Sequence, residues 1–377
     1  MRPTPLSKIL LDRIRARGPL TFAEYMQECL YHPEHGYYAQ PDQGPRADYQ
    51  TSVDVHPIFG RLLARQLAEM WETLGRPEEF TVVEAGAGTG RLAAQILDFS
   101  ARALPDCFRA LHYVAVERSA ARRAAIREAF AAAQLPASQA AVAESVPETI
   151  AAGCIFSNEL LDAMPVHRVV QNQGELSEIF VDAGEDGLRE VLRPLSSERV
   201  RDYFAEQKVE LGEGQHAEAG LEACSWVSGC FDRLARGFLL TIDYGYEAAE
   251  LYSRQHWRGT VMAYEKHRAS EDYYSAPGGQ DLTAHVNFSA LQSLSAQARQ
   301  ARPLNTGLVS QTQFLLNLGR ANEFADLYDE GQSEAERFHA REGLKTLIHP
   351  EGMGETFKVL IQHKGVDSPQ LTGLGPL

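Results

Sequence analysis

The stretch Phe80-Thr-Val-Val-Glu84-Ala-Gly86-Ala-Gly88-Thr-Gly90-Arg91-Leu92 decides the fold. Its first four residues form a short apolar run, typical of a buried strand in a parallel sheet. An acidic residue and three alternate glycines follow, and then a helix-compatible run over 91–99. Glycine is needed where a chain turns sharply from strand to helix and its backbone approaches a ligand closely. Because a helix start presents free N–H groups and a positive dipole end, the stretch predicts a ligand site.

The glycine spacing narrows the choice of ligand. A dinucleotide fingerprint requires G-x-G-x-x-G, which would place its third glycine at position 91, where this chain has Arg91. The pattern E-x-G-x-G-x-G instead resembles the first motif of class I methyltransferases that bind S-adenosylmethionine. In those enzymes the loop passes under the methionine part of the cofactor, and the acidic residue helps to hold its ammonium. The resemblance therefore implies S-adenosylmethionine held by Glu84, Gly86, Gly88 and Gly90; the alternative is a turn that binds nothing.

A second strand–helix unit follows the glycine stretch. Residues 112–116 read as a strand that ends in Glu117, and 119–133 read as a helix. In a doubly wound sheet, ligands bind beyond the carboxyl ends of the strands. A carboxylate can accept hydrogen bonds from two ribose hydroxyls. We therefore expect Glu117 to bind the cofactor, with a solvated surface glutamate as the alternative.

Polar side chains also follow a third strand, predicted over 153–156. Asn158 and Glu159 come after it, at the same ligand-facing edge, and Asp162 lies three residues further on. One helical turn would place both carboxylates on a single face. The alternative is a helix cap with acids that compensate the helix dipole. From the residues alone, both interpretations stay open.

The remaining pattern predicts an α/β protein, and the resemblance of the glycine stretch implies that its sheet is a class I methyltransferase (Rossmann-like) sheet. We expect parallel core strands, an antiparallel C-terminal edge and appended helical substrate elements. Further predicted elements are an amphipathic helix over 58–74, a hairpin over 166–172 and 176–181, helices within 196–236, and strands over 238–242 and 356–362. The expected regions are a helical region at 1–75, the methyltransferase core at 76–246, a substrate-covering region at 247–340 and C-terminal strands at 341–377.

Composition limits the class of protein. The 377 residues are 44% hydrophobic and 23% charged, an ordinary globular balance, and no apolar run is long enough to cross a bilayer. The five cysteines lack metal-ligand spacing and are typical of reduced thiols, so we expect no metal site and a cytoplasmic location. A net charge of −15 argues against nucleic acid as a partner and is compatible with a basic substrate.

Longer stretches resemble the MidA-like family, which includes the mitochondrial complex I assembly methyltransferase. The matching stretches are AEYM…HPEHGYY at 23–38, TS…IFG at 51–60, EAGAGTGRL at 84–92, SNELLDAMPVHR at 157–168, IDYGY at 242–246 and PGGQDLTAHVNFS at 277–289. The resemblance implies a class I methyltransferase fold and S-adenosylmethionine as cofactor. It also implies a protein substrate with a target arginine, since the best-known member dimethylates an arginine of a respiratory complex I subunit.

The resemblance assigns roles to particular residues. A guanidinium is protonated at all relevant pH values, and paired carboxylates can clamp it bidentately. We therefore expect Glu159 and Asp162 to be catalytic and Asn158 to bind the cofactor. The expected substrate-binding residues are Tyr37, Tyr38, Thr51, Ser52, His285 and Asn287.

Two departures from the family pattern concern the substrate. This chain has Val53-Asp54 where the family usually has Pro-Glu, and His285 and Asn287 where members with an LTADVDF stretch carry acids. Two alternatives to arginine methylation therefore stay open. One is a methyltransferase that acts on a small molecule or another side chain, and the other is a cofactor-binding assembly factor with little catalysis. The acceptor, the degree of methylation and the oligomeric state, with a homodimer as one alternative, are not decided by sequence.

Overall fold

The computed structural model describes residues 3–40, 52–135, 138–266, 268–297, 304–329 and 331–376. The chain divides into two compact units, each assembled from three separate segments. Unit 1 comprises Met1–Gln50, Leu161–Val227 and Gly245–Ser293, and unit 2 comprises Thr51–Leu160, Ser228–Tyr244 and Leu294–Leu377. This division differs from the four consecutive regions expected from the sequence, because strand pairing brings distant segments into one unit. The loop expected over 40–50 and the predicted site residue Thr51 lie outside the described residues, except for Gln40.

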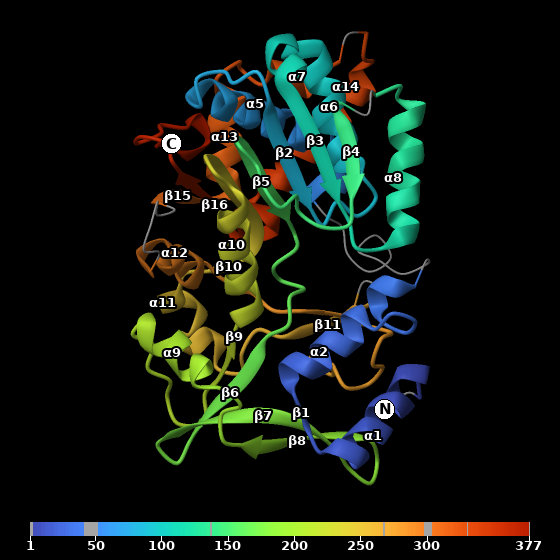
Figure 1. The fold of residues 1–377 in the computed structure, drawn as a ribbon, viewed down its shortest axis with the longest axis vertical. Coiled ribbons are helices and arrows are strands. Elements are labelled where there is room, and N and C mark those ends of the chain that lie inside the picture. Colours follow the sequence, from blue (N-terminus) through green and yellow to red (C-terminus); the bar gives the residue numbers. More distant parts are fainter. Residues whose placement is uncertain are drawn as a thin grey trace. The chain divides into compact units, whose positions relative to one another are not determined.

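Unit 2 is organised around a mixed sheet. Its strands are β2 (Phe80–Ala85), β3 (Leu111–Val116), β4 (Ala140–Ala143), β5 (Gly153–Asn158), β10 (Gly237–Tyr246), β15 (Leu304–Ser310) and β16 (Phe357–Lys364). They run in the order β15-β16-β10-β5-β2-β3-β4 (Figure 1). The strands from β10 to β4 are parallel, whereas β16 is antiparallel to both β10 and β15. The predicted parallel core with an antiparallel C-terminal edge is therefore confirmed.

The helices of unit 2 follow the periodicity of the sequence. They are α4 (Ser52–Val55), α5 (Ile58–Thr73), α6 (Arg91–Ala103), α7 (Pro105–Ala110), α8 (Ala120–Ala132), α13 (Gln311–Arg320) and α14 (Glu334–Ile348). The apolar face of α5 is buried in the same hydrophobic cluster as alternate residues of β2 and β3. Burial of one apolar stripe is what keeps an amphipathic helix on a sheet. The sheet edge where the parallel strands end is thereby held on a packed core.

Unit 1 contains two antiparallel sheets. Their strands are β1 (Leu20–Thr21), β6 (His167–Asn172), β7 (Glu175–Ala183), β8 (Leu188–Arg193), β9 (His216–Ala219), β11 (Met262–Glu265), β12 (Arg268–Ser270) and β13 (Asp281–Thr283). A further short strand, β14 (Val286–Asn287), pairs in parallel with the last two residues of β10. One sheet has the order β1-β7-β6-β9 with β8 on β7, and the other has the order β12-β11-β13. The predicted hairpin is confirmed as β6 and β7, with Gln173 and Gly174 both at positive φ in its turn.

The helices of unit 1 differ from the sequence prediction at one place, where a strand stands in a stretch predicted to hold helices. They are α1 (Pro5–Arg17), α2 (Phe22–Tyr31), α9 (Glu198–Glu206), α10 (Leu221–Arg233), α11 (Ala248–Leu251) and α12 (Phe288–Gln297), of which α10 and α12 run across the unit boundary. Strand β9 interrupts the predicted helical stretch 196–236, because its backbone pairs with β6. That pairing partner lies far away in the sequence, and tertiary pairing outweighed local helix propensity.

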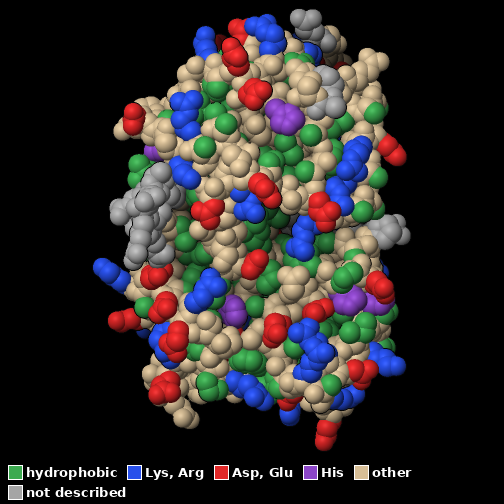
Figure 2. All heavy atoms as spheres, viewed as in Figure 1, with side chains coloured by type: hydrophobic (Ala, Val, Ile, Leu, Met, Phe, Trp, Pro, Cys, Tyr) green, Lys and Arg blue, Asp and Glu red, His purple; other side chains and the backbone are tan. Residues whose placement is uncertain are grey.

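The protein surface carries charges of both signs (Figure 2), and the cysteine thiols are unpaired with one another. Lysine and arginine side chains are interspersed with aspartate and glutamate over the face shown in Figure 2. All five cysteines are free. Within the described ranges, every helix is too short or too polar to cross a bilayer. The same ranges hold no group of three or more His, Cys, Asp or Glu side chains that could bind a metal ion.

Candidate cofactor and substrate sites

The turn between β2 and α6 has the backbone that its glycines predict. Gly86, Gly88 and Gly90 have φ values of 75°, 57° and 73°, a region that residues with a Cβ rarely adopt. A Cβ on Gly86 would meet Leu160 at 3.0 Å, and one on Gly90 would meet Ile126 at 3.0 Å. Among the described residues, a Cβ on Gly88 would come within 4 Å of the Gly86 carbonyl oxygen alone, at 3.9 Å. Two of the glycines therefore serve packing, whereas the described part of the chain leaves space open beside Gly88.

Glu117 is buried at the end of β3 and is not the solvated glutamate of the alternative interpretation. Its exposed fraction is 8%. One carboxylate oxygen accepts a hydrogen bond from the Gly88 N–H at 2.9 Å, and the other accepts one from the Ser119 N–H at 2.8 Å. Each oxygen can accept a further hydrogen bond. Glu117 therefore ties the glycine turn to the start of α8 and retains capacity for a ligand.

Glu84 is buried on β2 and has a partner that sequence reasoning missed. The Tyr113 hydroxyl on β3 donates to Glu84 Oε2 at 2.7 Å. Burial raises the pKa of Glu84 to about 8. The hydrogen bond from Tyr113 opposes this rise, and the charge of Glu117 adds to it. Tyr113 lies in an apolar strand, where the pattern indicates only a core residue. No local signal marks its hydroxyl as part of the site.

The loop after β5 is not the helical turn that the sequence predicts. Glu159 has a φ of 54°, in the left-handed region, and its N–H donates to the Ile242 carbonyl at 3.0 Å. The next N–H, of Leu160, donates to the buried Asp243 carboxylate at 3.1 Å. These bonds replace the ones a helix would make. The prediction that Glu159 and Asp162 share a helical face is therefore wrong, and the two residues belong to different units.

The Glu159 side chain joins two other predicted site residues in unit 2. Its Oε1 accepts hydrogen bonds from the Ser52 N–H at 3.1 Å and from Asn158 Nδ2 at 3.0 Å. The Ser52 hydroxyl itself is buried and donates to Gln311 Oε1 at 3.3 Å. The structure thus gathers Ser52, Asn158 and Glu159 where β5 ends, on the same edge of the sheet as Glu84 and Glu117.

Asp162 lies in unit 1 among tyrosines and a second acid. The Tyr38 hydroxyl donates to Asp281 Oδ1 at 3.0 Å. Burial, and then the charges of Asp281, Tyr31 and Asp162, raise the pKa of Tyr38 well above its ordinary value. Burial and the charges of Asp162 and Asp281 likewise raise the pKa of Tyr264. We call Tyr38, Asp162, Tyr264 and Asp281 the acid–tyrosine cluster.

The acid–tyrosine cluster contains two residues without a sequence assignment. Asp281 stands in the stretch 277–289 that carries the family resemblance, so a signal for it existed, whereas Tyr264 had none. The predicted residue Tyr37 is fully buried and packs edge-on against Tyr38, with ring centroids 5.2 Å apart. Tyr37 therefore supports the cluster from the hydrophobic core.

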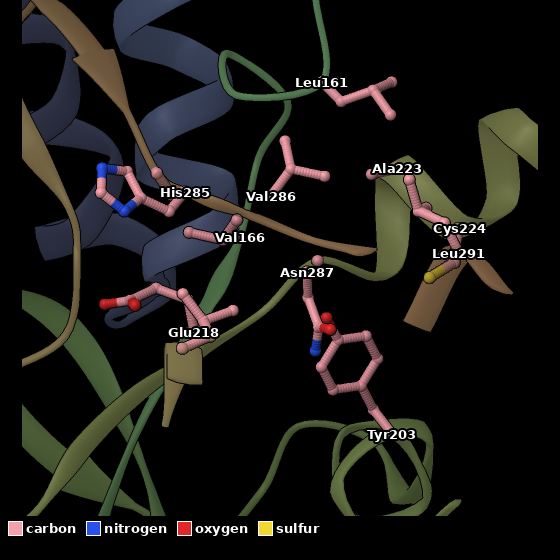
Figure 3. Close-up of a pocket in the computed structure, with 13 residues that line it drawn as sticks. Leu161, Val166, Tyr203, Glu218, Ala223, Cys224, His285, Val286, Asn287 and Leu291 are labelled. Carbon is pink, nitrogen blue, oxygen red and sulfur yellow. The ribbon is translucent and has the colours of Figure 1, made fainter. Parts of the chain in front are cut away.

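His285 and Asn287 line a small cavity of unit 1 (Figure 3). Burial, helped by the neighbouring His256, lowers the pKa of His285 to about 4, so this imidazole is neutral at physiological pH. The Asn287 amide donates to Gln207 Oε1 at 2.7 Å and to the Tyr252 hydroxyl at 3.0 Å, and its oxygen accepts from the Ala290 N–H at 3.1 Å. These bonds give Asn287 a structural task at the start of α12. A substrate role for either residue stays a prediction.

Comparison with known proteins decides the family. A family model described as "Putative S-adenosyl-L-methionine-dependent methyltransferase" matches residues 62–306. The chain belongs to this family. A structure of a Burkholderia thailandensis protein bound to S-adenosyl-homocysteine is 32% identical to this methyltransferase, with a TM-score of 0.86 and coverage of 99% of this chain and 97% of that one. The enzyme is thus a methyltransferase that uses S-adenosylmethionine.

Curated relatives are similar along nearly the whole chain. "Protein arginine methyltransferase NDUFAF7, mitochondrial" from Mus musculus is 29% identical over 381 residues, which cover 94% of this chain and 83% of the relative. The Drosophila melanogaster homolog is 29% identical over 385 residues, with coverage of 96% and 85%. Both are named as mitochondrial, so the cytoplasmic location expected from the sequence is wrong. Free thiols indicate a reducing compartment and do not say which one.

The residues at the ends of the parallel strands fit the cofactor. Within the described ranges, the space beside Gly88 is open at a helix start, where N–H groups can meet a carboxylate. Glu84 is an acceptor suited to an ammonium, and Glu117 has lone pairs left for ribose hydroxyls. When bound, the cofactor supplies an activated methyl group. The chain's own task is to hold and orient it, and the individual assignments of these residues stay predictions.

Proposed function

We propose that this methyltransferase is a protein arginine N-methyltransferase. The curated relatives carry the name protein arginine methyltransferase, and they align with nearly the whole chain. A guanidinium is planar, always charged and a donor of parallel hydrogen bonds. A site for it therefore needs carboxylates in a partly dry environment, with flat groups beside them.

The observation that carries the proposal is the acid–tyrosine cluster of unit 1. Asp162 and Asp281 are 6% exposed each, and both affect the pKa values of the same two phenols. Two buried acids beside two tyrosine rings are an environment in which a guanidinium can pair with carboxylates and lie against aromatic faces. An uncharged small molecule would gain little from these charges. The cluster thus favours a cationic acceptor.

Methyl transfer to arginine is an in-line displacement. A bond forms between a guanidinium nitrogen and the methyl carbon, the bond from that carbon to sulfur breaks, and its electron pair stays on sulfur. The nitrogen also gives up one proton. In our proposal, carboxylates orient the guanidinium and localise its charge, so that one nitrogen presents its lone pair. Asp162 is the candidate for this role in unit 1, and Glu159 is the candidate in unit 2. A carboxylate or water then receives the proton.

The protein partner that we propose is a subunit of respiratory complex I. This follows from the resemblance to the MidA-like family, which includes a complex I assembly methyltransferase, and from the mitochondrial names of the relatives. The acidic surplus of the chain, a net charge of −15, supports binding of a basic segment around the target arginine.

The test is identification of the methylated residue. The purified protein is incubated with isotope-labelled S-adenosylmethionine and a mitochondrial extract of its host, and the labelled protein is mapped by mass spectrometry. We expect label on an arginine of a complex I subunit. Label on a lysine or on a small molecule would contradict the proposal, and absence of any label with tight partner binding would favour the assembly-factor alternative.

A matched pair of variants tests the acid–tyrosine cluster. Asp281→Asn keeps the shape of the side chain and removes the charge, so we expect a fall in kcat/KM for the arginine substrate and an unchanged Kd for the cofactor. Asp186→Asn changes an exposed acid of the same unit and should leave both unchanged. If Asp281→Asn were as active as Asp186→Asn, the acid–tyrosine cluster would not be part of the acceptor site.

A further inference from the structure

A buried hydroxyl group in unit 2 needs a physical reason. Tyr113 is fully buried on β3, and its ring packs edge-on against Phe156, with centroids 6.3 Å apart. Phenylalanine would fill this space equally well. A buried hydroxyl is costly unless it has a hydrogen-bond partner. The partner here is Glu84 Oε2, at 2.7 Å.

Glu84 is held more tightly than its place in the cofactor motif requires. It lies one residue before the end of β2, between Ala115 of β3 and Phe156 of β5, and its exposed fraction is 4%. Among the described residues, Tyr113 is the side chain that donates a hydrogen bond to it. This bond fixes Oε2 and leaves Oε1 as the oxygen that can accept from a ligand.

The charged surroundings oppose ionisation of Glu84. Glu117, after β3, acts on it with the same sign of charge, and Cys154 on β5 acts on Tyr113. The cation Arg91, at the start of α6, forms an ion pair with Asp54. With a pKa raised to about 8, the Glu84 carboxyl is mostly protonated at pH 7. A cation placed beside it would favour the charged form.

We propose that Tyr113 is a positioning residue of the cofactor site, which fixes Glu84 so that Oε1 accepts from the cofactor's ammonium, and that cofactor binding releases the Glu84 proton to solvent. The O–H bond of the carboxyl breaks, the carboxylate remains in place, and buffer takes up the proton. The hydroxyl of Tyr113 stays protonated and donates to the new charge throughout. The cofactor affinity of this enzyme therefore depends on pH near neutrality.

The expected stoichiometry follows from the two titrations. At pH 7 a carboxyl with a pKa of about 8 is mostly protonated. A free α-amino group, with an ordinary pKa of about 7.7–8.0, takes up roughly 0.1 proton when it binds as the ammonium. Each cofactor bound should therefore cause a net release of less than one proton. Below pH 7 the affinity should fall by about tenfold for each pH unit.

Calorimetry measures this release directly. S-adenosyl-homocysteine, which carries the same ammonium, is titrated into the protein at pH 7 in buffers of different ionisation enthalpy, and the dependence of the heat on the buffer gives the protons released. We expect a net release of protons, less than one for each ligand bound, for the wild-type protein. Glu84→Gln should abolish the release. Methylthioadenosine, which lacks the ammonium, should bind without release.

Tyr113→Phe separates positioning from packing. The hydroxyl lowers the pKa of Glu84, so its loss should move the midpoint of the affinity–pH profile to higher pH and weaken binding at pH 7 by several-fold. Tyr328→Phe removes a hydroxyl from a half-buried tyrosine elsewhere in unit 2 and should leave the midpoint unchanged. A Tyr113→Phe midpoint equal to that of the wild type would overturn the positioning role. Absence of proton release in the wild type would overturn the coupling, whether or not either variant folds.

Discussion

Replacement of Glu117 by alanine should weaken cofactor binding through the glycine turn as well as through the ribose. The carboxylate accepts hydrogen bonds from the N–H groups of Gly88 and Ser119, at 2.9 Å and 2.8 Å, in a buried position. Alanine leaves both donors without this acceptor. A hydrogen bond to a charged group contributes about 1.5–3 kcal/mol. If one such bond is lost from the bound state, Kd should rise by about 10- to 150-fold.

Two further variants show whether this loss of cofactor affinity is specific to the Glu117 carboxylate. Glu117→Gln keeps one acceptor oxygen, so its Kd should lie between those of the wild type and Glu117→Ala. Glu144→Ala removes an exposed acid that follows β4 and pairs with Arg123, and it should leave Kd unchanged. Calorimetric titration with S-adenosyl-homocysteine measures each value, and circular dichroism shows that the variants are folded.

A ligand without the ribose hydroxyl separates the two parts of the effect. With a 2′-deoxyribose analogue, the ribose part of the Glu117 contribution disappears and the part that acts through the Gly88 N–H stays. We therefore expect a reduced but measurable difference between wild type and Glu117→Ala. A change of only a few tenths of a kcal/mol with the natural ligand, about twofold in Kd or less, would refute this reasoning.

Three other predictions concern single residues. Gly88→Val should abolish cofactor binding and leave the chain folded, because valine at a φ of 57° is strained and fills the space above the turn; calorimetry and circular dichroism check both parts. Glu159→Gln should lower methyl transfer by about a hundredfold or more with the cofactor Kd within a few-fold of wild type, and lost affinity with intact turnover would make Glu159 a cofactor ligand. Burial raises the pKa of Glu84 from its ordinary value of 4.5 to about 8, so between these pH values the folded chain holds a proton that the unfolded chain has lost. The free energy of unfolding of the wild type should therefore decline relative to that of Glu84→Gln as the pH rises from 5 to 8. Urea titrations at pH 5 and pH 8 measure both values, and an equal difference at the two pH values would contradict the prediction.

The sequence by itself determined the local units and the cofactor. The run from Phe80 to Arg91 folds as strand, glycine turn and helix because strand propensity, positive φ and helix periodicity are properties of neighbouring residues. The same reasoning placed Glu117 at the end of a strand, where the parallel order of the sheet turns it toward the glycine turn. It also identified the hairpin of β6 and β7 from its turn residues.

Only the tertiary structure decided how Glu159, Asp162, Glu84 and Asn287 are held. Glu159 leaves the helical path because its N–H and that of Leu160 bond to β10, more than 80 residues later in the chain. Glu84 accepts a hydrogen bond from the Tyr113 hydroxyl on β3. The Asn287 amide donates to Gln207 and Tyr252, which lie far from it in the sequence. Each of these outcomes depends on strand register and on partners distant in sequence. A local pattern carries no information about either, so chemistry that depends on such partners is settled only when the chain has folded.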